Sequence, residues 1–243
     1  DQGPPGEVPP AVEAAAEADA ARLRDELSRQ GVGADEPVGK LVLDVITAPG
    51  ERPVVGWHVH EAGAPGPGGR WDYPVPGEAP SRAYRKVVES LLFTGAPVSA
   101  GDLVLEIGAA PGGGTLAFLE RGARVLAIDP RPLDAAVLAR PGVAQRQATI
   151  GSVEELPTGV RWVACDAGIP PADVLAALAR LRAQLDGVAG LFWTLKLVHD
   201  SDATHLQRTL ARLSALGFRA PVAAQLPAHR RDLLVYARGA RVG

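Results

Sequence analysis

Cysteine and long apolar runs are almost absent from this 243-residue chain, and each absence excludes a class of protein or site. The one cysteine, Cys165, cannot form an intramolecular disulfide or a thiolate-rich metal site, so we expect a protein of the reducing cytoplasm. The five histidines lack metal-ligand spacing, and we therefore expect no metal. No run of about 18 consecutive apolar residues occurs, so neither a transmembrane helix nor a membrane partner is expected.

Lysine is also scarce, since three lysines, Lys40, Lys86 and Lys196, accompany 22 arginines. This usage indicates that lysine is kept for places that need a neutralisable amine, with composition bias as the alternative. The net charge of −3 is divided unevenly along the chain. Residues 1–80 hold 14 acidic and 6 basic residues, whereas residues 81–243 hold 14 and 19. The second segment is therefore basic and the first strongly acidic.

Residues 1–80 are expected to form a small α+β appendage. Its two ends, residues 1–10 and 62–80, are rich in proline and glycine, which predicts a disordered start and a linker. Between them, the alanine-rich stretch 11–30 predicts an exposed helix. The remaining expected elements are two strands that can pair as a hairpin, Lys40–Thr47 and Val54–His60.

From Ser81 onward, short apolar runs alternate with helical stretches. The first expected element is a helix that Ser81 can cap. The expected strands are Leu103–Ile107, Arg124–Ile128, Gln145–Thr149, Arg161–Cys165, Gly190–Leu197, Arg219–Ala224 and Asp232–Arg238. The further expected helices lie at 113–121, 132–138, 171–185 and 203–216. This alternation is typical of an α/β domain with a mostly parallel sheet, here spanning residues 81–243.

A glycine-rich turn, Gly108–Gly114, follows the first of these strands and leads into a helix, which brings backbone N–H groups close to a ligand. A dinucleotide fingerprint requires G-x-G-x-x-G, but Ala-Ala-Pro stands between Gly108 and Gly112. A Walker A loop requires lysine where Gly114 stands. The turn instead resembles the E/D-x-G-x-x-x-G motif of S-adenosylmethionine-dependent methyltransferases, which begins here at Glu106.

This resemblance implies a Rossmann-like methyltransferase fold with a mostly parallel seven-stranded sheet, and S-adenosylmethionine as the cofactor. About twenty residues after the motif, Asp129 ends the next strand, where a carboxylate can accept both ribose hydroxyls of an adenosine ligand. A tight turn with a surface carboxylate is the alternative. The residues expected to bind the cofactor are Glu106, Gly108, Ala110, Pro111, Gly112, Gly113, Asp129 and Asp166.

The segment 81–89 reads S-R-A-Y-R-K-V-V-E and resembles the S-R-A-x-x-K-[LV]-x-E segment of the FtsJ-like RNA ribose 2′-O-methyltransferases. Within that family, residues 81–238 are most similar to the RlmM type, which methylates a cytidine ribose of large-subunit ribosomal RNA. The family carries a Lys-Asp-Lys-Glu catalytic tetrad, and its positions fall on Lys86, Asp166, Lys196 and Asp232. The RlmM type also carries an N-terminal RNA-binding region containing a THUMP domain, of which residues 1–80 would hold at most a remnant.

The chemistry of the tetrad follows from the weakness of a ribose 2′-hydroxyl as a nucleophile, which calls for a positioned base. We expect Lys196 to be that base, with the other three residues orienting and tuning it. Burial and the cation Lys86 favour a neutral amine, whereas Asp166 and Asp232 favour the ammonium, and the sequence leaves this balance open. Asp232 also departs from the usual Glu, and its side chain is shorter by about 1.5 Å, one C–C bond.

Other interpretations remain for these residues and for the chain. Lys86 and Glu89 could form a surface pair on a helix, and Asp166 could cap a turn. An RNA partner predicts a basic surface, and residues 204–243 hold seven arginines against one acid, although no aromatic-rich stacking platform is evident. The alternatives to a ribose methyltransferase are a same-fold enzyme acting on a small molecule or another RNA position, and a non-catalytic relative that binds the cofactor or RNA.

Overall fold

A computed structural model of the chain describes residues 10–31, 39–46, 52–61, 71–197 and 205–239. The chain divides into two compact units, Asp1–Asp72 and Tyr73–Gly243. The expected domain boundary after residue 80 stays a prediction. The parts of the predicted elements and linkers that lie outside the described residues are 1–9, Thr47, 62–70 and 203–204.

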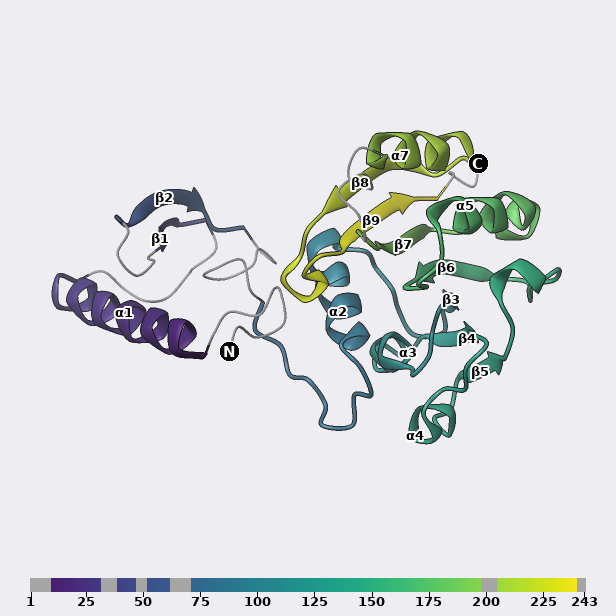
Figure 1. Ribbon diagram of the computed structural model, residues 1–243, viewed down its shortest axis with the longest axis horizontal. Helices are drawn as coiled ribbons and strands as arrows, with labels where there is room; N and C mark the ends of the chain where they lie inside the picture. The colour runs from purple at the N-terminus through teal and green to yellow at the C-terminus, as the bar shows by residue number, and fades with distance from the viewer. Residues whose placement is uncertain (1–9, 32–38, 47–51, 62–70, 198–204, 240–243) are drawn as a thin grey trace. The chain divides into compact units, whose positions relative to one another are not determined.

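Within its described residues, the smaller unit contains one helix and one hairpin (Figure 1). Helix α1 spans Pro10–Arg29, and strands β1 (Leu41–Ile46) and β2 (Val54–Val59) pair antiparallel, with Leu43 opposite Trp57. The predicted helix and hairpin are confirmed.

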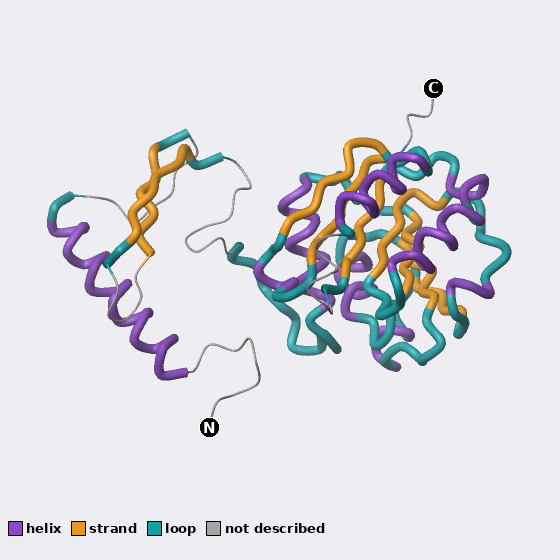
Figure 2. Tube along the Cα trace, turned by 45° about the horizontal axis from the view of Figure 1, so that its top comes forward, coloured by secondary structure: helices purple, strands orange, loops and turns teal. Residues whose placement is uncertain are grey.

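The larger unit is built on a seven-stranded sheet in the order β5-β4-β3-β6-β7-β9-β8 (Figures 1 and 2). Its strands are β3 (Leu103–Ile107), β4 (Arg124–Ile128), β5 (Val143–Arg146), β6 (Val160–Cys165), β7 (Gly190–Leu195), β8 (Arg219–Ala224) and β9 (Leu233–Arg238). Its helices are α2 (Ala83–Thr94), α3 (Gly113–Leu119), α4 (Ala135–Leu138), α5 (Pro171–Arg180) and α7 (Leu206–Ala215), with short 3₁₀ turns η2 (Ile150–Ser152), η3 (Arg182–Leu185) and η4 (Pro227–His229). Only β9 runs against its neighbours, so the predicted mostly parallel, Rossmann-like sheet is confirmed.

Alternation along the interior strand β3 shows how both faces of this sheet are covered. Leu105 and Ile107 belong to the main hydrophobic cluster, together with Val174 and Leu178 of α5. Glu106, which points to the opposite face, accepts a hydrogen bond from the Thr115 hydroxyl of α3. Successive side chains of a strand point to opposite faces, so this pattern places helices on both sides of the sheet.

The predicted position of the strand at Gln145–Thr149 is wrong, because β5 spans Val143–Arg146. The Gln145 side chain donates to the Arg131 carbonyl and accepts from the Leu133 N–H, at 2.7 and 3.0 Å, which fixes the strand against the preceding loop. The Ala148 N–H then donates to the Arg146 carbonyl at 2.9 Å, and this bond turns the chain out of the sheet.

Three charged residues lie at one edge of the sheet for a topological reason. Asp166 and Lys196 directly follow β6 and β7, which are parallel, so both lie at the carboxyl edge. Asp232 directly precedes the antiparallel strand β9, whose Leu233 pairs with Leu195 of β7. The first residue of β9 therefore lies at the same edge, which is where α/β sheets bind ligands.

Candidate active site

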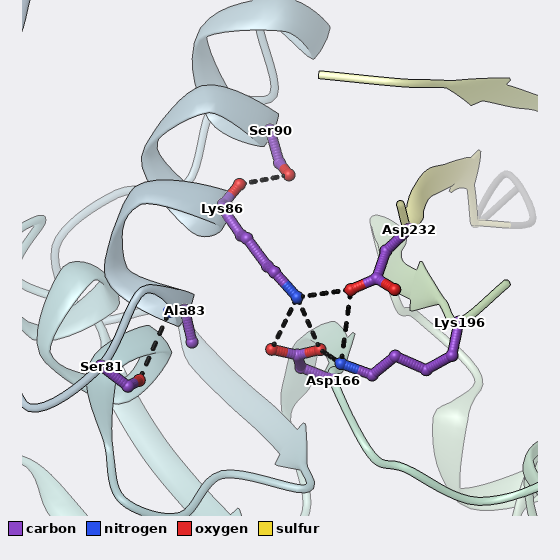
Figure 3. Close-up of polar contacts among 7 residues, drawn as sticks. All are labelled: Ser81, Ala83, Lys86, Ser90, Asp166, Lys196 and Asp232. Atoms are coloured by element: carbon purple, nitrogen blue, oxygen red, sulfur yellow. Dashed lines mark hydrogen bonds and ion pairs between the residues drawn. The ribbon is translucent and has the colours of Figure 1, made fainter. Parts of the chain in front are cut away.

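Helix α2 carries the first member of the expected tetrad on its buried side. The Ser81 hydroxyl accepts a hydrogen bond from the Ala83 N–H at 3.3 Å, at the start of the helix (Figure 3). Lys86 is 8% exposed and Glu89 is 5% exposed, so the surface pair considered for them is wrong. A lysine so deeply buried needs a partner of opposite charge.

Lys86 finds two such partners from distant parts of the chain. Its Nζ lies 2.8 Å from Asp232 Oδ2 and 3.3 Å from Asp166 Oδ1. The Nζ of Lys196 donates to Asp166 Oδ1 and lies 3.6 Å from Asp232 Oδ2. Figure 3 shows the four side chains pointing toward one another. The structure thus brings together all four residues of the expected tetrad, although Asp232 is the short variant.

The two carboxylates of the cluster affect the pKa of Lys196. Burial by itself lowers the pKa of this lysine, but the nearby carboxylates of Asp166 and Asp232 outweigh burial and raise the pKa above its usual value. Two cations and two anions give the cluster no net charge. The balance that the sequence leaves open therefore favours the ammonium form in this arrangement.

His229 is a neighbour of the cluster that the sequence analysis did not single out. It ends η4, is 2% exposed, and neither ring nitrogen has a hydrogen-bond partner among the described residues. Burial, followed by the positive charge of Lys86, lowers the pKa of this histidine to about 4. The ring is therefore neutral near pH 7 and adds no charge to the cluster.

A cavity of about 1030 Å³ opens beside the cluster at the carboxyl edge of the sheet. Its walls include three tetrad residues, Lys86, Asp166 and Lys196. The other walls hold four residues expected to bind the cofactor, namely Gly108, Ala110, Pro111 and Asp129. The volume matches the upper end of the range of about 300–1,000 Å³ for small-molecule sites.

Asp129 is held in the cavity wall by backbone groups. Its Oδ2 accepts the Ala110 N–H at 3.0 Å, and its Oδ1 accepts the Arg131 N–H at 2.8 Å. An ionised carboxylate has about four acceptor sites, so further hydrogen bonds can be accepted from a ligand. The surface-turn alternative for this carboxylate does not fit its 4% exposure.

Glu106, Gly112 and Gly113 do not line the cavity, although they were expected to bind the cofactor. Glu106 is 3% exposed, and burial raises its pKa to about 8 despite the opposing hydrogen bond from Thr115. A Cβ on Gly113 would lie 2.4 Å from the Ser81 hydroxyl oxygen, so this glycine allows close packing of the α3 and α2 termini. All three residues are buried, so they lie within the fold and not at the cavity surface.

Gly108 is required by the turn itself. Its φ is +76°, and a Cβ there would lie 2.4 Å from the Ala167 Cα. The Asp166 N–H donates to the Ile107 carbonyl at 2.9 Å in the same place. The glycine motif after β3 and the aspartate after β6 are thus in direct contact.

The cavity also has walls that the sequence analysis missed. Arg82 precedes α2, and one face of α5 contributes Asp173, Ala177 and Arg180. The spacing of these three residues (i, i+4, i+7) was the available signal, because it marks one helix face. Arg180 donates to the Ile150 carbonyl at 2.8 Å and so holds the loop after β5, which also lines the cavity.

Two other sequence expectations concern metals and membranes. Within residues 10–31, 39–46, 52–61, 71–197 and 205–239, no three His, Cys, Asp or Glu side chains are grouped to hold a metal ion. In the same residues, no helix combines the length and apolar character needed to cross a membrane.

Comparison with known proteins shows that the chain is similar to ribosomal RNA methyltransferases. The chain is 31% identical over 223 residues to the large-subunit ribosomal RNA methyltransferase M of Halorhodospira halophila, covering 89% of this chain and 62% of that protein. It is 32% identical over 193 residues to the protein of the same name from Laribacter hongkongensis, covering 74% and 54%. The predicted resemblance is confirmed. No family model matches the chain.

The extent of this similarity differs from the expectation. Residues 81–243 are only 163 of the 243 residues, so a match to 89% of the chain includes part of residues 1–80. The chain itself spans less than two thirds of the length of these two relatives.

Solved structures agree with the fold. A Lactococcus lactis protein described as a hemolysin has a TM-score of 0.55 at 16% identity, covering 67% of this chain and 89% of that one. A Plasmodium falciparum protein described as a ribosomal RNA methyltransferase has a TM-score of 0.52 at 15% identity, covering 65% and 97%. At this identity the likeness concerns the fold alone, which is the Rossmann-like methyltransferase fold predicted from the glycine motif.

Proposed function

We propose that this chain transfers a methyl group from S-adenosylmethionine to a ribose 2′-hydroxyl of RNA, with ribosomal RNA as the substrate. The observation that carries the proposal is the convergence of Lys86, Asp166, Lys196 and Asp232 beside a cavity at the carboxyl edge of the sheet. The names of the relatives support RNA as the substrate class. A ribosomal RNA substrate would place the enzyme in the cytoplasm.

The cavity fits the proposed cofactor. Asp129 would bind the ribose of the cofactor, since its carboxylate keeps acceptor sites beyond the two backbone bonds. The Gly108–Pro111 turn would approach the cofactor through its backbone, and α5 would close the opposite wall. When bound, S-adenosylmethionine would supply the methyl group of its positively charged sulfur. The 2′-oxygen would form a bond to this carbon as the carbon–sulfur bond breaks, and the cofactor would leave as a neutral thioether.

The tetrad would hold and deprotonate the hydroxyl group. Lys196 Nζ would take the hydroxyl proton, while Asp166 and Lys86 fix its position by hydrogen bonds and charge. A base must be neutral before it accepts a proton, whereas the carboxylates favour the ammonium of Lys196. Additional positive charge in the cavity would lower the pKa of this amine, because like charges disfavour each other. Cofactor binding and proton loss from Lys196 would therefore be coupled.

The basic surface of the larger unit would contact the RNA backbone. His205, Arg208 and Arg212 are exposed on or beside α7, opposite the buried Leu213. Arg82 is exposed where it lines the cavity. Arginines in such positions bind phosphates and orient the strand without reading its sequence.

The test is methyl transfer from labelled S-adenosylmethionine to large-subunit ribosomal RNA, offered both bare and as ribosomal particles. Nuclease digestion of the product to nucleosides then separates ribose methylation from base methylation. We expect the label in a 2′-O-methylnucleoside. Label in a methylated base, or transfer to neither substrate by a protein that binds the cofactor, would contradict the proposal.

A further inference from the structure

The turn that carries Asp232 is a compact structure between β8 and β9. It contains η4, and the Asp232 N–H donates to the His229 carbonyl at 2.9 Å. Arg230 has φ +54° and ψ −103°, and its carbonyl accepts from the Gln225 side chain. Because these bonds hold the turn together internally, the place of Asp232 depends on where the whole turn is docked.

Glu89 of α2 is hydrogen-bonded to this turn. Its Oε2 accepts the Ala228 N–H at 2.7 Å, and its Oε1 accepts the Tyr73 hydroxyl at 2.9 Å. The side chain is 5% exposed, and a short bond from a backbone N–H to a carboxylate is among the stronger protein hydrogen bonds. Glu89 lies three residues after Lys86, so the helix that presents Lys86 also holds the turn that presents its partner.

We propose that Glu89 is a positioning residue, which docks the η4 turn on α2 so that the short carboxylate of Asp232 reaches Lys86. The need for this docking follows from side-chain length, because Asp falls short of Glu by about 1.5 Å. The contact is nevertheless made, with Asp232 Oδ2 at 2.8 Å from Lys86 Nζ. The inference rests on the proposed function for its kinetic consequences, but its geometric consequence can be measured separately.

The neighbouring histidine supports this role for Glu89. His229 follows Ala228 directly and is buried, yet its ring nitrogens have no hydrogen-bond partner among the described residues. The ring therefore fills space next to the cluster without fixing the direction of the turn. In this proposal, the hydrogen bond between Glu89 and the Ala228 backbone sets the direction.

Kinetics of Glu89→Ala test the proposal, with Glu120→Ala as a matched control. Glu120 also accepts a hydrogen bond from a tyrosine, the Tyr84 hydroxyl at 2.5 Å, but lies at the end of α3 away from the turn. We expect Glu89→Ala to lower kcat about 100-fold, the scale of a 1 Å misplacement, with little change in KM for S-adenosylmethionine. Glu120→Ala should keep the wild-type kcat. A folded Glu89→Ala protein with wild-type kcat would overturn the proposal.

Two further variants distinguish positioning from a general loss of structure. Glu89→Gln keeps an oxygen that can accept the Ala228 N–H, so this variant should lower kcat less than about tenfold. If the turn moves away from α2 in Glu89→Ala, the longer side chain of Asp232→Glu should again reach Lys86. We then expect kcat of the double variant to be about tenfold higher than that of Glu89→Ala, which a double-mutant cycle measures. Absence of any rescue, or an equal loss in Glu89→Gln, would contradict docking as the role of Glu89.

A measurement without catalysis separates this inference from the proposed function. The chain has three lysines, so ¹³Cε-labelled lysine gives three assignable NMR signals. Glu89→Ala, or Glu89→Gln if the alanine variant does not fold, should move the Lys86 signal, whereas Glu120→Ala should not. If the wild-type chain transfers no methyl group to RNA, the proposed function fails, and this signal still decides whether Glu89 docks the turn.

Discussion

Lys86 and Asp232 are 146 residues apart in the chain, and the Nζ of Lys86 lies 2.8 Å from Asp232 Oδ2. This contact bears on the one position, Asp232, at which the sequence departs from the Lys-Asp-Lys-Glu pattern that it resembles. The shorter side chain reaches its partner because the turn before β9 lies close to α2. The catalytic proposal is therefore compatible with Asp232.

Replacement of the proposed base should remove catalysis without removing cofactor binding. Lys196→Ala is expected to lower kcat for RNA methylation by about 10³-fold or more, since general-base catalysis contributes about 10²–10⁴-fold. The affinity for S-adenosylmethionine, measured by calorimetry, should change by no more than about twofold. Lys40→Ala, at an exposed position of the smaller unit, is the control and should keep both values. Unchanged turnover in Lys196→Ala would exclude its role as the base.

The pH dependence of the reaction should report the carboxylates around Lys196. Because Asp166 and Asp232 raise the pKa of Lys196, the neutral amine is scarce near pH 7 and kcat should rise with pH through the accessible alkaline range. Asp166→Asn removes the strongest of the groups that raise this pKa, so the rise should move to lower pH. The ¹³Cε signal of Lys196 should titrate in the same direction. A rate independent of pH between about 6 and 9 would contradict this assignment.

Glu106 should make the protein less stable as the pH rises. Its pKa is raised to about 8 by burial, so the folded state keeps a proton that the unfolded state loses at lower pH. The contribution of Glu106 to the free energy of unfolding is therefore fully present below the unfolded pKa near 4.5. It is lost as the pH rises toward the folded pKa of about 8. Glu106→Gln resembles the protonated acid and should gain on the order of 3 kcal/mol at pH 7, from about 1.4 kcal/mol per pKa unit.

Denaturant unfolding at pH 5 and pH 8 checks this prediction. The gain of Glu106→Gln over wild type should be larger at pH 8. Glu154→Gln, at an exposed position, gives the baseline for the same chemical change. A Glu106→Gln protein that is equally destabilised at both pH values would show that the carboxyl group is ionised in the folded state.

Arg82 should contribute to RNA binding through phosphate. The side chain is exposed and lines the cavity, so Arg82→Ala should raise KM for RNA and reduce the slope of log KM against log salt by about one. The matched control is Arg161→Ala, because Arg161 is exposed near the amino end of β6, whereas the cluster lies at the carboxyl end. Equal salt slopes for wild type and Arg82→Ala would exclude this contact.

The helices and strands of the larger unit follow closely from local sequence pattern. The strands Leu103–Ile107, Arg124–Ile128 and Arg219–Ala224 have the predicted bounds. In the first two, a mostly buried aliphatic run ends at Gly108 or at Asp129, which is the local signal of a strand end. The predicted bounds of β5 were wrong, because hydrogen bonds from the Gln145 side chain to a neighbouring loop fix the position of this strand at Val143–Arg146. Such bonds join segments that periodicity cannot relate.

Local residue patterns were sufficient to predict the glycine turn and most of the strands in their order along the chain. The resemblance to the FtsJ-like family, and not a local pattern, pointed to the four charged residues. The packing of the chain was needed to show that Glu106 is buried, that the carboxylates of Asp166 and Asp232 raise the pKa of Lys196, and that Glu89 binds the Ala228 backbone. Burial and charge–charge distances depend on how segments up to 146 residues apart pack together, and side-chain chemistry alone does not contain that information.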